Sequence, residues 1–472
     1  MEKTKTRPLT STTTLSKRQQ KIAMKQLSST KENNTSFRSA ERNFKAKFTN
    51  PNMENVVDFS NLENNSIESN SKILLVELSE NLYDLDKNLF SNFTTEKYSS
   101  KEENDFQKPL GGRQIAYSLI GHPVLPNPFT ETTQRRLIKN TLCEWARKPN
   151  KTSLDPFYAM RDNESLFERH IIDLTNYSNP EHEPFYYKSL FQDTSEAKES
   201  FEYSENQNTK NLSATSSDLQ IASSTETNNA QKHNSNESNK ITVTEPKNSF
   251  YRQNHTATEL LDSLRWTTIG NQYNWTTKSY DTNLQIPIHS DLVHLMTTVV
   301  RSISQAKIVG SLNEKFSNNM IINDYDYLKY KVEAGVINYY GLDSTLLAHV
   351  DRSENNMEAP LVSISLGCSC IYLIGGETKD DIPTPILLRS GDIIASCGKS
   401  RSSFHGVPRI FQNSSPSYLT NPEIIYDSET FTSSTDPETL RKDQKALNSD
   451  WKPFSDYIAS HRINFNARQC DF

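Results

Sequence analysis

The sequence predicts an α+β protein whose C-terminal part is an antiparallel β-sandwich or barrel. After Tyr330, short runs of strand-favouring residues alternate with turn residues, which is typical of such folds. Upstream of this part, two segments have apolar residues at helical spacing. Only 34% of the 472 residues are hydrophobic, below the roughly 45–50% apolar share of ordinary globular chains. We therefore expect one folded core interrupted by polar insertions.

The predicted strands are short. Val362, Ile364 and Leu366 alternate with serines, which indicates one buried face and one polar face. The other predicted strands lie at 336–340, 370–374, 386–388, 393–395, 409–411 and 462–465. A polar loop at 412–450 interrupts the series.

Two helices are expected before the strands, and the segment 120–129 reads as extended. The first helix spans about 130–146, where Leu137, Ile138 and Leu142 recur at helical spacing. The second begins at Ser290, with Ser290 or Asp291 as its N-cap.

Two polar stretches flank or interrupt the core. Residues 192–249 hold 11 apolar residues in 58, too few to offset the chain entropy lost on folding, so we expect a disordered insertion. Residues 1–50 carry 12 Lys and Arg against three acids, which fits a disordered basic arm over 1–35 or a mitochondrial transit peptide. Four aromatic residues indicate a segment that docks on the core: Phe37, Phe44, Phe48 and Phe59.

Charge and cysteine content exclude several classes of protein. The net charge of −6 excludes a polybasic coat for nucleic acid, so any basic binding face is local. Five cysteines exclude a disulfide scaffold and suit a reducing compartment. Cys368 and Cys370 have no second cysteine pair nearby and are expected to be buried thiols. No apolar run approaches the 18 residues of a membrane span.

Two His-x-Asp triplets, at 289–291 and 349–351, are candidate metal sites. Residues i and i+2 of a strand project to the same side, and two imidazoles with one carboxylate form the facial triad of non-haem Fe(II) oxygenases. The first triplet opens a helix, where its residues are better explained as a cap. The second follows a strand and needs a later histidine, either His405 or His461.

The segment 462–468 reads Arg-Ile-Asn-Phe-Asn-Ala-Arg. In a strand, its two arginines and two asparagines share one face. Such a face is hard to bury without an anion, and guanidinium pairs well with carboxylates. Asn338 and Tyr340, also two residues apart, could add donors. The alternative is an exposed polar edge strand.

Taken together, these motifs resemble the AlkB family of Fe(II)/2-oxoglutarate-dependent nucleic-acid dioxygenases, in particular the branch of its first eukaryotic homologue. The resemblance covers roughly 36–60, 115–185 and 255–472 and leaves out 1–35 and 192–249. Its motifs are found at 337–345, 349–354, 390–393, 405–409 and 462–469, and outside that part at 37–60, 126–129 and 264–267.

The resemblance implies a double-stranded β-helix (jelly-roll) core with Fe(II), 2-oxoglutarate and dioxygen as cofactors. It implies that iron is held by His349, Asp351 and His405. It implies that Arg462 pairs with the distal carboxylate of 2-oxoglutarate, helped by Tyr340 and Asn464, and that Asn338 and Arg468 lie at the end that chelates iron.

The resemblance also places a nucleotide-recognition lid around Trp266 and Tyr273, where an aromatic ring can stack on a flipped-out base. Core packing of these aromatics is the alternative. The sequence departs from the pattern of the family at two positions, which leaves the exact substrate open. Ser353 stands where the bacterial enzyme has an acid, and a base-contacting arginine of the family is either replaced by Lys379 or absent. The chain thus divides into an arm (1–35), a docking segment with helices (36–191), the insertion (192–249), the lid and a helix (250–325) and the dioxygenase domain (326–472).

We expect an enzyme that removes methyl groups from bases of tRNA by oxidation, with DNA open as a second substrate. A hydroxylated N-methyl group falls apart to formaldehyde and the free base. A protein or histone demethylase or hydroxylase of the same chemistry, and a non-catalytic nucleic-acid-binding scaffold, are the alternatives. A monomer without a membrane span is expected. Nucleus, cytoplasm and mitochondrion remain open as its compartment.

Overall fold

The structure is a computed structural model. It describes residues 34–45, 50–64, 66, 70–78, 115–191, 248–274, 279–280, 286–311, 315–321, 324–422 and 451–470. Nearly all of the predicted basic arm and of the predicted insertion lies outside these residues, as do Phe48 and most of the polar loop at 412–450.

Seven α-helices occur in the described residues: α2 (Ser36–Lys45), α5 (Glu131–Leu142), α6 (Leu166–Thr175), α7 (Ala257–Leu261), α8 (Ser290–Ile303), α9 (Ser417–Thr420) and α11 (Lys452–Ile458). In this part of the chain, no helix has the length and apolar character needed to cross a membrane.

The strands form two antiparallel sheets. The large sheet has ten strands in the order β10-β9-β1-β2-β3-β16-β13-β18-β11-β6, and the small sheet has four in the order β12-β17-β14-β15. The strands of the large sheet are β1 (Ile73–Glu77), β2 (Ile115–Leu119), β3 (His122–Leu125), β6 (Trp266–Gly270), β9 (Lys307–Ser311), β10 (Lys315–Ile321), β11 (Ala334–Gly341), β13 (Leu361–Gly367), β16 (Ile393–Ser396) and β18 (His461–Arg468). Those of the small sheet are β12 (Leu346–His349), β14 (Cys370–Ile374), β15 (Thr384–Leu388) and β17 (His405–Ile410). Two short pairs lie outside them: β4 (Tyr186–Tyr187) with β5 (His255–Thr256), and β7 (Tyr273–Asn274) with β8 (Ser279–Tyr280).

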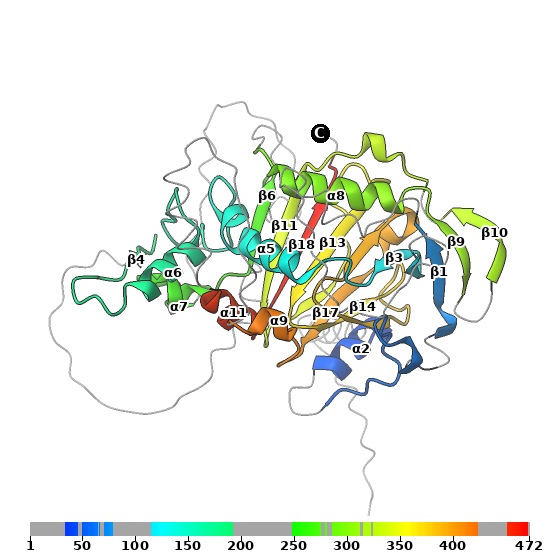
Figure 1. Cartoon of the computed structure of the whole chain (residues 1–472), viewed down its shortest axis with the longest axis horizontal. Helices are drawn as coiled ribbons and strands as arrows, with labels where there is room; N and C mark the ends of the chain where they lie inside the picture. The colour runs from blue at the N-terminus through cyan, green and yellow to red at the C-terminus, as the bar shows by residue number, and fades with distance from the viewer. Residues whose placement is uncertain are drawn as a thin grey trace, which may run out of the picture.

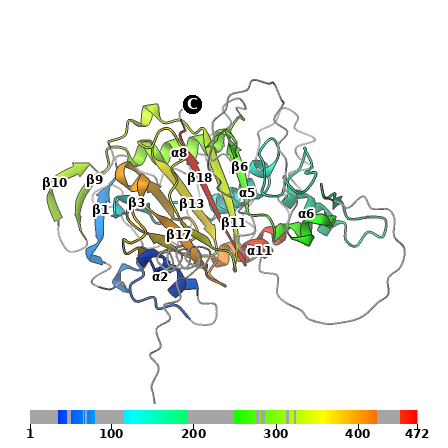
Figure 2. The same ribbon diagram turned by 180° about the vertical axis from the view of Figure 1, so that it is seen from behind.

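The two sheets face each other and helices cover the outer side of each. One apolar cluster lies between the sheets and includes Ile394 of β16 and Ile374 of β14. A second cluster, which includes Val362 of β13 and Phe465 of β18, joins the large sheet to α5 and α8. Figures 1 and 2 show these helices on the face of the large sheet that is turned away from the small sheet. The architecture is therefore α+β and jelly-roll-like.

The predicted strands all form, and most are one to three residues longer than predicted. The largest shift of a strand boundary is in β17, which begins at His405 instead of residue 409. This difference matters because it places His405 inside a strand that pairs with β12, the strand of His349.

The predicted helices form with small corrections at their ends. The first is divided: α5 ends at Leu142 and a short 3-10 helix follows at Glu144–Ala146. At the start of α8, His289 is the N-cap, whereas we expected Ser290 or Asp291. An imidazole nitrogen can accept the hydrogen bond of a backbone N–H as a hydroxyl or carboxylate does. Sequence preferences alone therefore selected the wrong residue.

The large sheet draws its strands from several of the predicted segments. β1, β2 and β3 come from 36–191, β6, β9 and β10 from 250–325, and β11, β13, β16 and β18 from 326–472. The pairing of β16 with β3 and of β11 with β6 joins these segments edge to edge. The described parts of the three segments thus contribute strands to the same large sheet.

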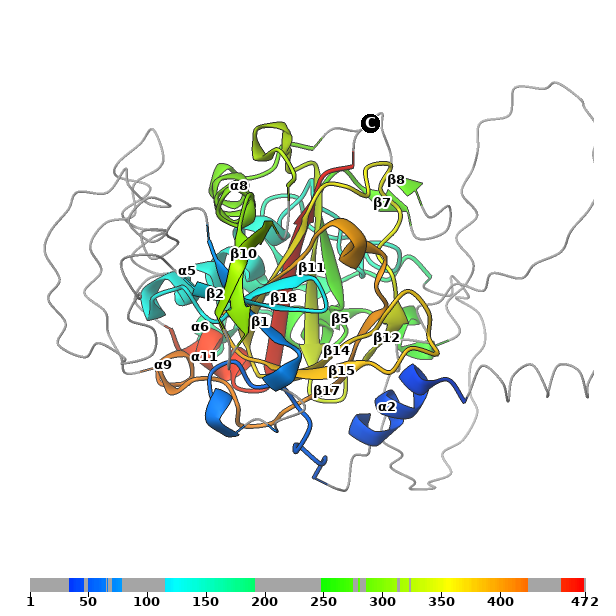
Figure 3. The same cartoon turned by 90° about the vertical axis from the view of Figure 1, so that its right-hand side faces the viewer.

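Helix α2 covers the outer face of the small sheet (Figure 3). Its Phe37 is fully buried and packs in a cluster with Ile371 and Leu373 of β14. The buried carboxylate of Glu41 accepts a hydrogen bond of 2.7 Å from the backbone N–H of Ala348. Because β12 is an edge strand, this bond holds a donor that the sheet leaves unpaired, one residue before His349.

We predict that Glu41→Ala lowers the free energy of unfolding by about 1–3 kcal/mol, since it removes the partner of a half-buried backbone donor. Urea denaturation followed by circular dichroism measures the change. The matched control is Glu54→Ala, which truncates an exposed glutamate of the same N-terminal region and should leave stability unchanged. Equal stability of the two variants would contradict this role for Glu41.

The described residues on either side of 192–247 are held together. Tyr187 pairs with His255 where β4 meets β5. The backbone N–H of Ser189 donates to Asn254 Oδ1 at 3.0 Å, and its hydroxyl donates to Tyr251 O at 2.6 Å. These contacts join the two described residue ranges on either side of the segment.

We expect replacement of 192–247 by a short Gly-Ser linker to change the free energy of unfolding by no more than about 2 kcal/mol. The flanking contacts persist, and each doubling or halving of loop length changes closure entropy by only about 0.6 kcal/mol. Denaturant titration of the shortened protein tests this. Insoluble or unfolded protein would show that the segment is part of the core.

Candidate metal and dicarboxylate site

A cavity of about 230 Å³ lies between the two sheets. Its walls come from both sheets and from the β7–β8 hairpin. All the predicted iron and 2-oxoglutarate residues line it: Asn338, Tyr340, His349, Asp351, His405, Arg462, Asn464 and Arg468. The structure thus brings together residues that lie up to 130 positions apart in the sequence.

His349, Asp351 and His405 form a compact set of possible metal ligands. Each offers one ligand atom, and these atoms all lie within 4.8 Å of one another. Antiparallel pairing of β12 with β17 places His349 directly opposite His405. Asp351 follows two residues after β12, and its carboxylate lies 3.9 Å from His349 Nε2 and 3.7 Å from His405 Nε2.

Hydrogen bonds fix the orientation of both imidazoles. His349 Nδ1 lies 2.9 Å from the carbonyl oxygen of Leu347, and His405 Nδ1 lies 3.3 Å from that of Ser403. A carbonyl can only accept, so in each ring Nδ1 carries the proton and Nε2 keeps its lone pair. Both Nε2 atoms face the Asp351 carboxylate, which is the arrangement that a divalent d-block cation requires.

The charge states of the three residues also suit a metal. Burial by itself would raise the pKa of Asp351, but the nearby positive charge of Arg468 contributes most to outweighing burial, and this pKa is held well below its usual range. Burial lowers the pKa of His405 to about 3. The carboxylate is therefore ionised and the His405 imidazole neutral at physiological pH, and these are the forms that bind metal.

Arg462 supplies a buried positive charge on the opposite wall. Its side chain is 1% exposed, and its Nη2 donates to Ser365 Oγ at 2.8 Å. Among the described residues, its Nε and Nη1 have no hydrogen-bond partner. A buried guanidinium with two unused donors is costly unless an anion meets it, so the site fits a carboxylate ligand here.

The register of β18 explains why these polar side chains share one wall. Ile463, Phe465 and Ala467 point into the cluster under the helices, so the alternate residues point into the cavity. Arg462 pairs with Tyr340, and Asn464 pairs with Asn338 on one side and Ser365 on the other. The predicted polar face of 462–468 is therefore buried in the cavity and is not an exposed edge.

Arg468 lies at the metal end of this wall. Its Nη1 is 3.6 Å from Asp351 Oδ1 and 2.7 Å from Glu354 Oε1, and its Nη2 donates to Asn466 Oδ1 at 2.7 Å. Its Nε has no partner among the described residues. Glu354 lies only three residues after Asp351 and is contacted by Arg401. Neither residue stands out in the sequence as part of the site.

Of the two predicted lid aromatics, the structure brings only Tyr273 to the cavity. Its hydroxyl lies 3.0 Å from Ser353 Oγ, and its ring lies 5.1 Å from that of Tyr280, which also lines the cavity. Trp266 lies on β6 opposite Asn338 of β11 and is not among the described residues that line the cavity. Stacking on a base by Trp266 therefore gains no support from the structure.

The remaining candidates have structural roles. His289 Nδ1 accepts a hydrogen bond of 3.3 Å from Asp291 N, and Asp291 forms an ion pair of 2.9 Å with Arg136, so this triplet is a helix cap. His461 stacks on Tyr457, with ring centroids 4.0 Å apart. All five cysteines are free and buried, as expected for Cys368 and Cys370.

Comparison with known proteins places the chain in a family. The family model described as the 2OG-Fe(II) oxygenase superfamily matches residues 218–468, more than half of the chain. The human protein "Nucleic acid dioxygenase ALKBH1" is 33% identical over 379 residues, which are 79% of this chain and 71% of that protein.

Two further relatives match over shorter lengths. The Schizosaccharomyces pombe protein "tRNA demethylase abh1" is 34% identical over 206 residues, 44% of this chain and 52% of that protein. The Arabidopsis thaliana protein "DNA N(6)-methyladenine demethylase ALKBH1A" is 32% identical over 216 residues, 45% of this chain and 50% of that protein. The chain thus spans about half the length of these two relatives. With the family match, the extended similarity to the human protein and the His–Asp–His cluster beside a buried arginine, the chain belongs to the 2OG-Fe(II) oxygenase superfamily and is AlkB-like within it.

Proposed function

We propose that this protein is an Fe(II)- and 2-oxoglutarate-dependent dioxygenase that oxidatively demethylates methylated bases of tRNA, with DNA as a second substrate. The proposal rests on one observation: the His349–Asp351–His405 cluster lies in the same cavity as Arg462. Arg462 is buried, and two of its guanidinium nitrogens have no hydrogen-bond partner among the described residues. The names of the relatives support the nucleic-acid substrate.

The residues present fit both cofactors. His349, Asp351 and His405 would hold Fe(II), and Arg462, with Tyr340 and Asn464 beside it, would hold the distal carboxylate of 2-oxoglutarate. Asn338 and Arg468 lie on the same wall as Arg462, and Arg468 is at the iron end. Bound together, iron, 2-oxoglutarate and dioxygen supply the oxidising power for C–H hydroxylation, with 2-oxoglutarate converted to succinate and CO₂.

The chain itself contributes placement and exclusion. Ser365 orients the Arg462 guanidinium through the bond to its Nη2, so that its other donors remain available for a carboxylate. Asn464 Nδ2 donates to Ser363 Oγ at 2.7 Å, which fixes the amide beside the arginine. When the hydroxylated carbon is a methyl group on a base nitrogen, the product releases formaldehyde and restores the unmodified base.

The lid also bears on substrate choice. At the position of Ser353, where the bacterial enzyme has an acid, the structure shows a hydroxyl that contacts Tyr273. The chain therefore presents no carboxylate to a base at this position, and we propose that aromatic contacts from Tyr273 contribute more to base binding than a charged contact does.

The experiment is an oxidation assay on short RNA containing 1-methyladenine, with Fe(II), ascorbate and 2-oxoglutarate, followed by mass spectrometry of the nucleosides. The expected result is conversion to adenine only when 2-oxoglutarate is present. A DNA strand with the same lesion and a methylated histone peptide are run in parallel. Turnover of the peptide alone would favour a protein demethylase, and no turnover of any substrate despite bound iron would favour a non-catalytic scaffold.

A further inference from the structure

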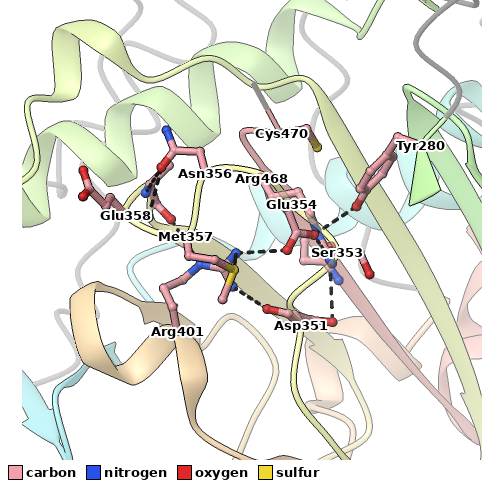
Figure 4. Close-up of polar contacts among 12 residues, drawn as sticks. Tyr280, Asp351, Ser353, Glu354, Asn356, Met357, Glu358, Arg401, Arg468 and Cys470 are labelled. Atoms are coloured by element: carbon pink, nitrogen blue, oxygen red, sulfur yellow. Dashed lines mark hydrogen bonds and ion pairs between the residues drawn. The ribbon is translucent and has the colours of Figure 1, made fainter. Parts of the chain in front are cut away.

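Beside the metal cluster lies a group of buried charges formed by Glu354, Arg401 and Arg468 (Figure 4). Glu354 is at its centre, with a side chain that is fully buried. Arg401 and Arg468 meet its two oxygens: Arg401 Nη2 is 3.1 Å from Oε2, and Arg468 Nη1 is 2.7 Å from Oε1. A buried carboxylate is tolerated only when it is paired in this way.

Both arginines also reach Asp351. Arg401 Nη1 donates to the carbonyl oxygen of Asp351 at 3.2 Å. Arg468 Nη1 is 3.6 Å from the Asp351 carboxylate, too far for a good hydrogen bond, whereas its bond to Glu354 is short. Arg468 Nη1 therefore lies between the carboxylates of Asp351 and Glu354, and its hydrogen bond to Glu354 is the stronger interaction.

A tyrosine of the lid, Tyr280, also contacts Glu354. Tyr280 donates from its hydroxyl to Glu354 Oε1 at 3.0 Å, as Figure 4 shows. The neighbouring residue Ser353 contacts Tyr273, which faces Tyr280 across the β7–β8 hairpin. Two tyrosines of the hairpin are thus tied to two consecutive residues of the loop that follows Asp351.

We propose that Glu354 is a positioning residue: it holds Arg468 away from the Asp351 carboxylate, so that this carboxylate is free for the metal, and it anchors the lid hairpin through Tyr280. The inference rests on the metal site of the proposed function but not on its nucleic-acid substrate. Without the Glu354 charge, the Arg468 guanidinium has Asp351 as its nearest carboxylate and competes with the cation for it.

The test uses the full chain and Co(II) alone, titrated anaerobically and followed by visible absorption. Glu354→Gln keeps the size of the side chain and removes its charge, and we expect it to bind Co(II) at least tenfold more weakly. Glu358→Gln is the matched control, because it makes the same change at an exposed position in the same loop, and it should stay within twofold of the unmodified protein.

A double variant separates positioning from general stability. If Arg468 is the competitor, Glu354→Gln/Arg468→Met should bind Co(II) within about threefold of the unmodified protein. If Glu354 were only structural, the double variant would bind no better than Glu354→Gln, and the proposal would be overturned. If Glu354→Gln does not fold, the same comparison is made with Glu354→Asp, whose shorter carboxylate cannot bridge the two arginines. Unmodified protein that binds no Co(II) would instead refute the metal site itself.

Discussion

Asp351→Ala is expected to abolish both iron binding and turnover. The change removes one of three protein ligands and the only anionic one, which leaves two neutral imidazoles for a divalent cation. Loss of a group that merely orients a ligand costs about 10–100-fold in metal affinity, so loss of the ligand itself should cost more than about 100-fold. Metal analysis of the purified protein and the demethylation assay measure the two effects, which should appear together.

His289→Ala is the matched control for this variant, because it alters the other His-x-Asp triplet. It removes only a cap of α8, where loss of the hydrogen bond costs about 0.5–2 kcal/mol of stability. Iron content and most of the activity should be retained. An active Asp351→Ala protein, or an iron-free His289→Ala protein, would contradict the assignment of the metal site.

Arg462→Ala is expected to weaken 2-oxoglutarate binding by about 2–5 kcal/mol, the usual cost of truncating one partner of a buried charge pair. Arg462 is almost fully buried and offers two unused donors to the cavity. Its removal therefore leaves the ligand's carboxylate without a charged partner. Metal affinity should persist, since no metal ligand is removed. Titration of 2-oxoglutarate into the Mn(II)-loaded protein, followed by calorimetry, measures the loss.

Arg352→Ala is the matched control, because Arg352 is an exposed arginine next to Asp351. Its 2-oxoglutarate titration should overlay that of the unmodified protein. If the Arg462→Ala titration overlays it as well, Arg462 is not the carboxylate partner. Loss of metal in Arg462→Ala would instead point to damage of the whole cavity.

The sequence was sufficient for the parts of the site that lie within single strands. The alternation of 462–468 predicts which side chains share a face, and the structure shows Arg462, Asn464 and Arg468 in one cavity. The His-x-Asp spacing likewise predicts two ligands in one place. A strand has a side-chain period of two whatever surrounds it, so such patterns can be recognised without knowledge of the fold.

The sequence could not identify the contacts between segments. Glu354 resembles any polar loop residue until the fold buries it against Arg401, 47 positions later, and Arg468, 114 positions later. The same is true of Glu41, whose partner Ala348 lies 307 positions away. Composition and periodicity carry no information on such pairs, because the register of distant strands and the paths of loops determine them.

The two aromatic residues predicted for the lid also could not be told apart until the tertiary structure was known. The resemblance to the AlkB family pointed to both Trp266 and Tyr273 as aromatic residues of the lid. Only the tertiary structure distinguished them: pairing of β6 with β11 places Trp266 in the large sheet, while the β7–β8 hairpin carries Tyr273 and Tyr280 to the cavity. The sequence by itself determined the class of chemistry, because ligand types and spacing follow from local geometry. Which side chains surround that chemistry was decided by the fold, because burial and long-range pairing exist only once the sheets have assembled.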